Sequence, residues 1–154
     1  MNRFKNWQPP ELEDGKPCKY GWVVKGVDNF TLGENTDIGY GTYIQAQEGI
    51  AIEKDVQIGG GCYIYSVDTI SDKRGPIIIK AGACVGAGSI ILPNVTIGKG
   101  ATIGAGTRVL GDVPAGYTLW EEVTWNCIYP LRIGKGIGQR RWFWGRNNGS
   151  KKES

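Results

Sequence analysis

Aliphatic residues recur every six positions through the middle of the chain. The longest unbroken run is Ile79, Val85, Ile91, Ile97, Ile103 and Val109. Four positions after each of these comes a small or β-branched residue, namely Ala83, Ser89, Val95, Ala101, Thr107 and Val113. The same register occurs upstream at Leu32, Ile38 and Ile44, and again at Ile52, Ile58 and Ile64. A helix needs apolar spacing near 3.6 residues, and a half-buried strand needs alternation of apolar and polar residues. A period of six fits neither pattern.

A period of six is typical of short strands that are each followed by a corner, with one large and one small side chain pointing inward. The pattern therefore predicts an all-β fold, a parallel β-helix whose stacked coils bury a continuous aliphatic column. Glycine, with 25 of 154 residues, supplies the positive φ that such corners use. All six Trp lie outside the repeat, as expected for a narrow prism. Cys62 falls at a small inward position, which predicts a buried thiol.

Two interruptions break the count and define the expected organisation. Ile44 and Ile52 are eight residues apart, which predicts a small bulge, and Ile64 and Ile79 are fifteen apart. The second gap predicts a polar excursion loop over 65–78, where function is often found on a rigid scaffold. We expect a lead-in over 1–25 that closes one end through Trp22, a coil over 26–118, and a Trp-rich basic cap and tail over 119–154.

Composition narrows the possible functions. The net charge of +3 is mild, and no apolar run approaches the roughly 20 residues that span a bilayer. Four cysteines lie far apart without a Cys-x-x-Cys pair, which favours a reduced cytoplasmic protein without membrane association. The segment 140–146 interleaves aromatics with arginines, but a cap over the open coil end explains this better than nucleic-acid binding.

Four stretches carry a resemblance to a known family. They are GPIIIKAGACVGAGS at 75–89, ILPNVTIG at 91–98, IGAGT at 103–107 and DVP at 112–114. Together they resemble the signature of the left-handed β-helix acyltransferases, and most of all the sugar O- and N-acetyltransferases. The resemblance covers about residues 26–118. It implies a left-handed coil, a homotrimer with active sites between neighbouring subunits, acetyl-CoA as co-substrate, and no metal.

The resemblance also implies where coenzyme A binds. In the family, its pantetheine arm lies in a groove between coils, hydrogen-bonded to backbone groups at small residues. The matching positions are Ala87 and Ala105, with Gly86 and Gly104 beside them keeping the backbone approachable. Gly111 stands where the family often has Lys before Asp-Val-Pro. Arg108 or the basic tail is the alternative source of phosphate contacts.

The catalytic positions depart from the family pattern. Relatives commonly use a His in the excursion loop as general base, but the chain has no His and Val67 stands at that place. Asp68 and Ser66 are the candidate catalytic residues. Each has a plain alternative role, a solvated loop charge for Asp68 and a turn cap for Ser66.

The expected acceptor region departs from the pattern too. The Ile-Leu-Asp stretch of many sugar acetyltransferases reads Ile44-Gln45-Ala46 here, so the acceptor-orienting acid is missing. Tyr43, Gln45 and Tyr65 are the candidate acceptor-binding residues, with Tyr63 nearby. The alternative is that these tyrosines pack at a subunit contact.

Three functions follow from these departures. The first is transfer of an acetyl group to a small amine, for which a nucleotide-linked amino sugar of surface-polysaccharide synthesis is the family-weighted acceptor. An amine tolerates loss of the base because it is intrinsically more nucleophilic than a hydroxyl. The second is O-acetylation of a sugar, and the third is a scaffold that has lost catalysis. A γ-type carbonic anhydrase shares the fold but needs three His, so the absence of His excludes it.

Overall fold

The computed structural model describes residues 6–120 and 143–145. The coil is built from three sheets, which we call A, B and C in the order in which the chain first enters them. Sheet A contains β1 (Val23–Lys25), β4 (Tyr43–Gln45), β7 (Tyr63–Tyr65), β12 (Ile90–Ile91) and β15 (Arg108–Val109). Sheet B contains β2 (Phe30–Leu32), β5 (Ile50–Ile52), β10 (Ile77–Ile79) and β13 (Val95–Ile97). Sheet C contains β3 (Asp37–Ile38), β6 (Gln57–Ile58), β11 (Cys84–Val85), β14 (Thr102–Ile103), β16 (Tyr117–Leu119) and β17 (Phe143–Gly145).

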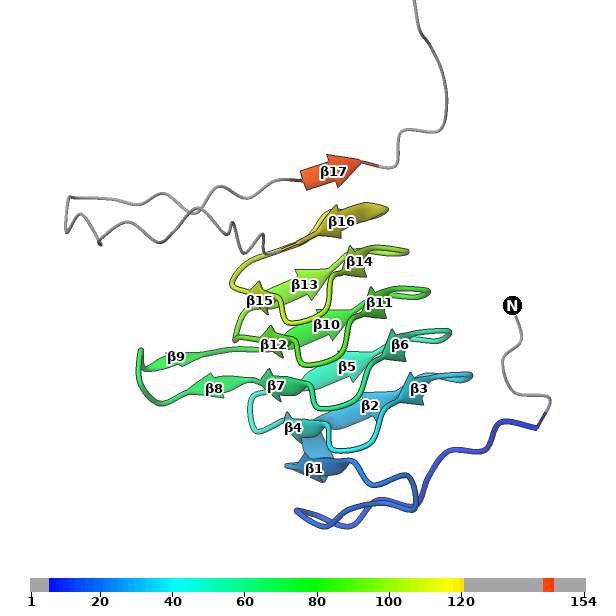
Figure 1. Ribbon diagram of the computed structural model, residues 1–154. Coiled ribbons are helices and arrows are strands. Elements are labelled where there is room, and N and C mark those ends of the chain that lie inside the picture. Colours follow the sequence, from blue (N-terminus) through cyan, green and yellow to red (C-terminus); the bar gives the residue numbers. More distant parts are fainter. Residues whose placement is uncertain (1–5, 121–142, 146–154) are drawn as a thin grey trace, which may run out of the picture.

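Each turn of the chain visits A, B and C before it returns to A one level higher (Figure 1). Strands on neighbouring levels pair in parallel, except for β17, which is antiparallel to β16. This stacking aligns the six-residue repeat, so that Ile44 pairs with Ile64 and Ile64 with Ile91, each fully buried. The predicted parallel β-helix is confirmed. Parallel pairing also brings β1 into the coil, so the coil begins at Val23.

The small inward position forms a column at the corner between sheets C and A. From the lowest level upward it contains Trp22, Thr42, Cys62, Ser89 and Thr107, each just before a strand of sheet A. Cys62 is fully buried, which confirms the predicted core thiol, and burial raises its pKa. Its Sγ lies 3.3 Å from the Gly86 carbonyl oxygen, so the thiol is held as a hydrogen-bond donor.

The lead-in is tied to the first level of the coil. Asp14 accepts hydrogen bonds from the Lys25 Nζ at 2.6 Å and from the backbone N–H groups of Gly26 and Val27 at 2.6 and 3.2 Å. These contacts, that with Lys25 first, lower the Asp14 pKa to about 2. Trp22 is only 2% exposed and packs edge-on against Phe30, so its indole covers the open end of the coil.

The excursion leaves the coil at the corner between sheets A and B. It is a hairpin of β8 (Val67–Asp68) and β9 (Lys73–Arg74), paired antiparallel, that projects from the side of the coil (Figure 1). Tyr65 still belongs to β7, and the chain rejoins the coil in β10. The expected loop over 65–78 is thus an ordered hairpin between two coil strands.

Candidate functional site

A shallow groove of about 440 Å³ runs along sheet C at its edge toward sheet A. It crosses four levels of the coil. Its lining consists of Asp37, Gly39, Gln57, Ile58, Gly59, Gly60, Cys84, Val85, Gly86, Ala87, Thr102 and Ile103. Two of the residues predicted to bind the cofactor, Gly86 and Ala87, lie at its centre.

The floor of this groove consists largely of glycines, because the coils stack too closely there to leave room for side chains. A Cβ on Gly59 would lie 2.5 Å from the Ala87 nitrogen, and one on Gly86 would lie 2.3 Å from the Ala105 nitrogen. Gly98, at another corner, meets the Ala115 nitrogen at the same 2.3 Å. These glycines are therefore required by coil stacking, and the shallow groove follows from that requirement.

The backbone polarity of the groove is set from inside the coil. The Thr42 hydroxyl donates to the Gly59 carbonyl at 3.1 Å, and the Ser89 hydroxyl lies 2.8 Å from the Gly86 carbonyl. Among the described residues, the N–H groups of Gly60 and Ala87 have no hydrogen-bond acceptor. The groove thus offers backbone donors to a ligand while its carbonyls are engaged beneath.

The remaining predicted cofactor residues lie elsewhere on the upper levels. A Cβ on Gly104 would lie 2.6 Å from the Trp120 indole, so that side chain covers Gly104. The described groove ends at Thr102 and Ile103, and its lining includes neither Gly104 nor Ala105. Arg108 lies on β15, exposed on sheet A, one corner beyond the groove.

A second hollow, of about 510 Å³, lies on sheet A beside the same corner. It is lined by Tyr43, Tyr63 and Tyr65 together with small residues of the corner. The Tyr63 and Tyr65 rings stack with centroids 6.0 Å apart and planes at 11°, and Tyr43 lies 6.0 Å from Tyr65. Burial raises the Tyr65 pKa, so its phenol stays protonated. The structure brings the predicted Tyr43 and Tyr65 together, and Tyr63, which the sequence placed nearby, lies with them.

Gln45 and Ser66 brace the base of the hairpin. The Gln45 Oε1 accepts from the Val67 N–H at 3.1 Å, and the buried Ser66 hydroxyl donates to the Gln45 carbonyl at 2.7 Å. The Ser66 oxygen also accepts from the Glu48 N–H at 3.0 Å. Neither side chain lines the tyrosine hollow.

Asp68 is the last residue of β8, and its side chain is engaged with the hairpin turn that follows. It accepts from the Ser71 hydroxyl and from the Ile70 N–H, the latter at 3.0 Å. These hydrogen bonds, the Ser71 contact first, lower its pKa. A lowered pKa makes the carboxylate a weaker base. The hairpin lies at the corner between A and B, so one chain does not bring Asp68 or Ser66 to the groove between C and A.

Sequence reasoning missed the outward side chains that wall the groove, namely Asp37, Gln57, Cys84 and Thr102. Each comes one position before a large inward residue of the repeat. In a strand, successive side chains point to opposite faces. The period of six therefore held the signal for this outward row, although it could not show which of the three sheets bears the groove.

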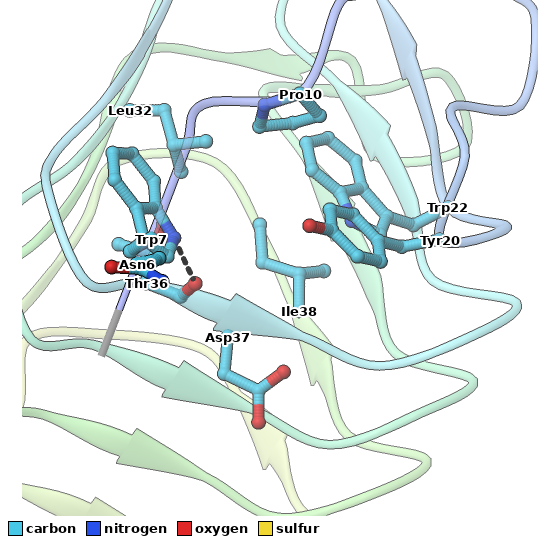
Figure 2. Close-up of a pocket in the computed structure, with 9 residues that line it drawn as sticks. All are labelled: Asn6, Trp7, Pro10, Tyr20, Trp22, Leu32, Thr36, Asp37 and Ile38. Carbon is cyan, nitrogen blue, oxygen red and sulfur yellow. Dashed lines mark hydrogen bonds between the residues drawn. The ribbon is translucent and has the colours of Figure 1, made fainter. Parts of the chain in front are cut away.

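A smaller pocket of about 160 Å³ lies under the open end of the coil (Figure 2). Trp7 stands on one side and Trp22 with Tyr20 on the other, while Ile38 closes the side toward the core. The Trp7 Nε1 donates to the Thr36 carbonyl at 2.9 Å, which holds the lead-in across the pocket. The arrangement is that of an aromatic end cap.

Two sequence profiles match the chain. The bacterial transferase hexapeptide profile (six repeats) matches residues 76–111, and the profile for the hexapeptide repeat of succinyl-transferase matches residues 30–66. No curated protein sequence matches.

Solved structures with a similar fold include those of three bacterial proteins. A hexapeptide-repeat containing acetyltransferase from Vibrio cholerae has a TM-score of 0.61 and 21% identity over 65% of this chain and 62% of its own. The serine acetyltransferase CysE of Neisseria gonorrhoeae has a TM-score of 0.57 and 23% identity over 84% of this chain and 42% of its own. A point variant of AntD, an N-acyltransferase from Bacillus cereus, was solved with dTDP-4-amino-4,6-dideoxyglucose and coenzyme A. It has a TM-score of 0.51 and 23% identity over 68% of this chain and 74% of its own.

Profiles and fold together define the class. Each half of the coil matches a hexapeptide-repeat profile, and the fold is a parallel β-helix built from hexapeptide repeats. The resemblance noted in the sequence is confirmed for the repeat and the fold. Within the described residues, no helix is long and apolar enough to cross a membrane, and no cluster of three His, Cys, Asp or Glu could hold a metal.

Proposed function

We propose that this protein transfers an acyl group, most simply acetyl, from coenzyme A to a small acceptor amine in the cytoplasm. The observation that carries the proposal is the groove along sheet C. Gly60 and Ala87 line it, and their N–H groups have no hydrogen-bond acceptor among the described residues. An extended chain of amides such as the pantetheine arm needs donors of this kind for its carbonyl oxygens. The hexapeptide profiles of known transferases over both halves of the coil support the same assignment.

In this proposal the reaction proceeds in a ternary complex. The acceptor lies in the tyrosine hollow, across the corner from the groove, and its amine attacks the thioester carbonyl. A C–N bond forms, the C–S bond breaks, and the electron pair leaves with the coenzyme A sulfur, which takes up a proton as the amine loses one. Proximity and orientation supply most of the rate enhancement, because no acyl-enzyme forms.

The choice of an amine rests on the weakness of the available bases. The chain has no His, and internal hydrogen bonds lower the Asp68 pKa. A hydroxyl acceptor depends on general-base help worth roughly 10²–10⁴ in rate, whereas an unprotonated amine attacks without it. The amino-sugar nucleotide bound to AntD is an acceptor of the proposed kind, and synthesis of a surface polysaccharide would consume such a product.

We further propose that the active site is completed by a second copy within a homotrimer. The hairpin and the groove lie at different corners of one coil, so only a neighbouring copy can bring a hairpin to the groove. At the hairpin tip, Ile70 is 97% exposed. In the proposed trimer this side chain is buried against the neighbouring copy.

The contact can be tested by replacing Ile70 with Asp, which would place a charge in the proposed interface. We expect sedimentation equilibrium to show a trimer for the parent and a shift to monomer for Ile70→Asp at equal concentration. Thr69→Ala, also exposed in the hairpin turn, is the matched control and should stay trimeric. A parent that sediments as a monomer would rule out the trimer.

The proposed activity is tested first by calorimetric titration with desulfo-coenzyme A. We expect one saturable site per chain, followed by coenzyme A release from acetyl-coenzyme A when amino sugars are supplied. Turnover with hydroxyl sugars but not with amines would assign O-acetylation instead. Absence of binding at millimolar ligand would reject the enzyme assignment in favour of a scaffold derived from the same fold.

A further inference from the structure

Trp120 occupies a position that glycine takes on the levels below. It follows Leu119 in β16 as Gly104 follows Ile103 in β14 and Gly86 follows Val85 in β11, and these three strands stack in register. Its ring lies against Gly104, at 2.6 Å from the place a Cβ would take there. Trp120 nevertheless remains 54% exposed. An indole thus rests on the backbone at the upper end of the glycine column with much of its surface open to solvent.

The two ends of the groove differ in chemistry. Asp37 brings a carboxylate to the lower end. At the upper end lies the indole of Trp120, and Arg108 lies on the same level as Gly104, just past the corner onto sheet A. Neighbouring strands are about 4.8 Å apart, so Trp120 lies roughly 10 Å above Gly86, two strand spacings along the groove. A ligand with a phosphorylated aromatic end is therefore favoured to place that end upward.

We propose that Trp120 is the stacking platform for the adenine ring of coenzyme A, and so recognises the nucleotide part of the acyl donor. This inference rests on the proposed function, because it assumes that the pantetheine arm occupies the groove at Gly60 and Ala87. Bases stack on exposed indoles because both present flat π-faces. The opposite direction would bring the phosphates of coenzyme A to Asp37, where like charges repel.

This direction has a consequence for the reacting group. With adenine at Trp120, the arm descends past Ala87 and the thioester lies on the lower levels of the groove. The tyrosine hollow occupies the same lower levels on the other side of the corner. The donor's acyl group and the acceptor are then neighbours across the corner between sheets C and A.

The test compares two ligands that differ only in the phosphorylated nucleotide. Coenzyme A and pantetheine are titrated calorimetrically into the full chain and into Trp120→Leu. We expect Trp120→Leu to weaken coenzyme A binding about tenfold or more, within the range measured for base–aromatic stacking, and to leave pantetheine binding unchanged. Trp120→Phe should restore most of the coenzyme A affinity, because phenylalanine also stacks.

Trp7→Leu is the matched control, since it removes an indole from the opposite end of the coil, and should bind both ligands as the parent does. Equal affinity of the parent and Trp120→Leu for coenzyme A would overturn the stacking role. Equal weakening of both ligands would also overturn it, by showing a general distortion of the groove. Failure of the parent to bind either ligand would instead reject the proposed function itself.

Discussion

At the residue scale, the hairpin shows how packing can reassign polar side chains that look catalytic in a sequence. Ser66 is fully buried, with its hydroxyl joined to the Gln45 carbonyl and the Glu48 N–H. Its oxygen is thus held as a structural link between β7 and the preceding corner. Asp68 is engaged in a turn within its own hairpin. Both arrangements follow from short polar side chains satisfying nearby backbone groups.

We expect Asp68→Asn to reduce acyl transfer to an amine less than tenfold, since loss of a true general base costs roughly 10²–10⁴. Initial rates at saturating donor, across pH, would measure this. A rate loss of a hundredfold would instead make Asp68 the base.

The same substitution should change how stability depends on pH. Because the Asp68 pKa is lowered from 3.8 in the folded protein, the ionised carboxylate stabilises the fold above pH 3.8. This stabilisation disappears as the pH falls through the pKa of the folded state, and Asp68→Asn should lack this contribution.

At the element scale, two kinds of glycine alternate at the corners. Gly86 has a close neighbour, with the Ala105 nitrogen 2.3 Å from the Cβ position. Gly88, two residues later, has a φ of +70° and no heavy atom within 4 Å of its Cβ position. The first is needed for the distance between levels, and the second for a left-handed backbone conformation at the turn.

The two substitutions should therefore differ in cost. Gly88→Ala keeps the stack and should lower the free energy of unfolding by about 1–2 kcal/mol, the strain of a left-handed alanine. Gly86→Ala forces two levels apart and should cost clearly more, with loss of coenzyme A binding. Urea unfolding of both variants measures the difference. Equal destabilisation would contradict the stacking requirement.

At the scale of the whole molecule, a stack of coils must end, and an open end exposes core and backbone. The inward column of Trp22, Thr42, Cys62, Ser89 and Thr107 shows the solution at the lower end. Inner levels use small residues because another level lies on each side. On the first level, a large indole fits because no coil lies beneath it.

Trp22→Ala should accordingly destabilise the whole coil by about 3–5 kcal/mol, the usual range for removing a buried tryptophan. Trp120→Leu, at the exposed indole of the opposite end, should change the unfolding free energy much less. Urea unfolding at one protein concentration compares the two, and concentration must be held constant because assembly shifts apparent stability. Similar losses in both variants would show that Trp22 is no more important to the stack than a surface residue.

The sequence by itself determined the coil. Large and small residues that recur with a period of six can be buried efficiently in one way, by stacking short strands with glycine at the corners. Ile44, Ile64 and Ile91 needed no further information to be placed inside, and neither did Cys62. The candidate cofactor residues Gly86 and Ala87 could be placed on one corner for the same reason. Tyr43 and Tyr65 could be placed on one sheet face by strand alternation.

Only the tertiary structure decided the features that depend on contacts between different levels and corners of the coil. Trp120 covers Gly104 because the last level brings residues sixteen apart in sequence into register. The groove lies on sheet C, with Asp37 at one end, because the outward side chains differ among the three sheets. The hairpin stands at another corner because it was inserted after a strand of sheet A. The repeat specifies burial one level at a time, whereas a site needs the geometry of several levels together.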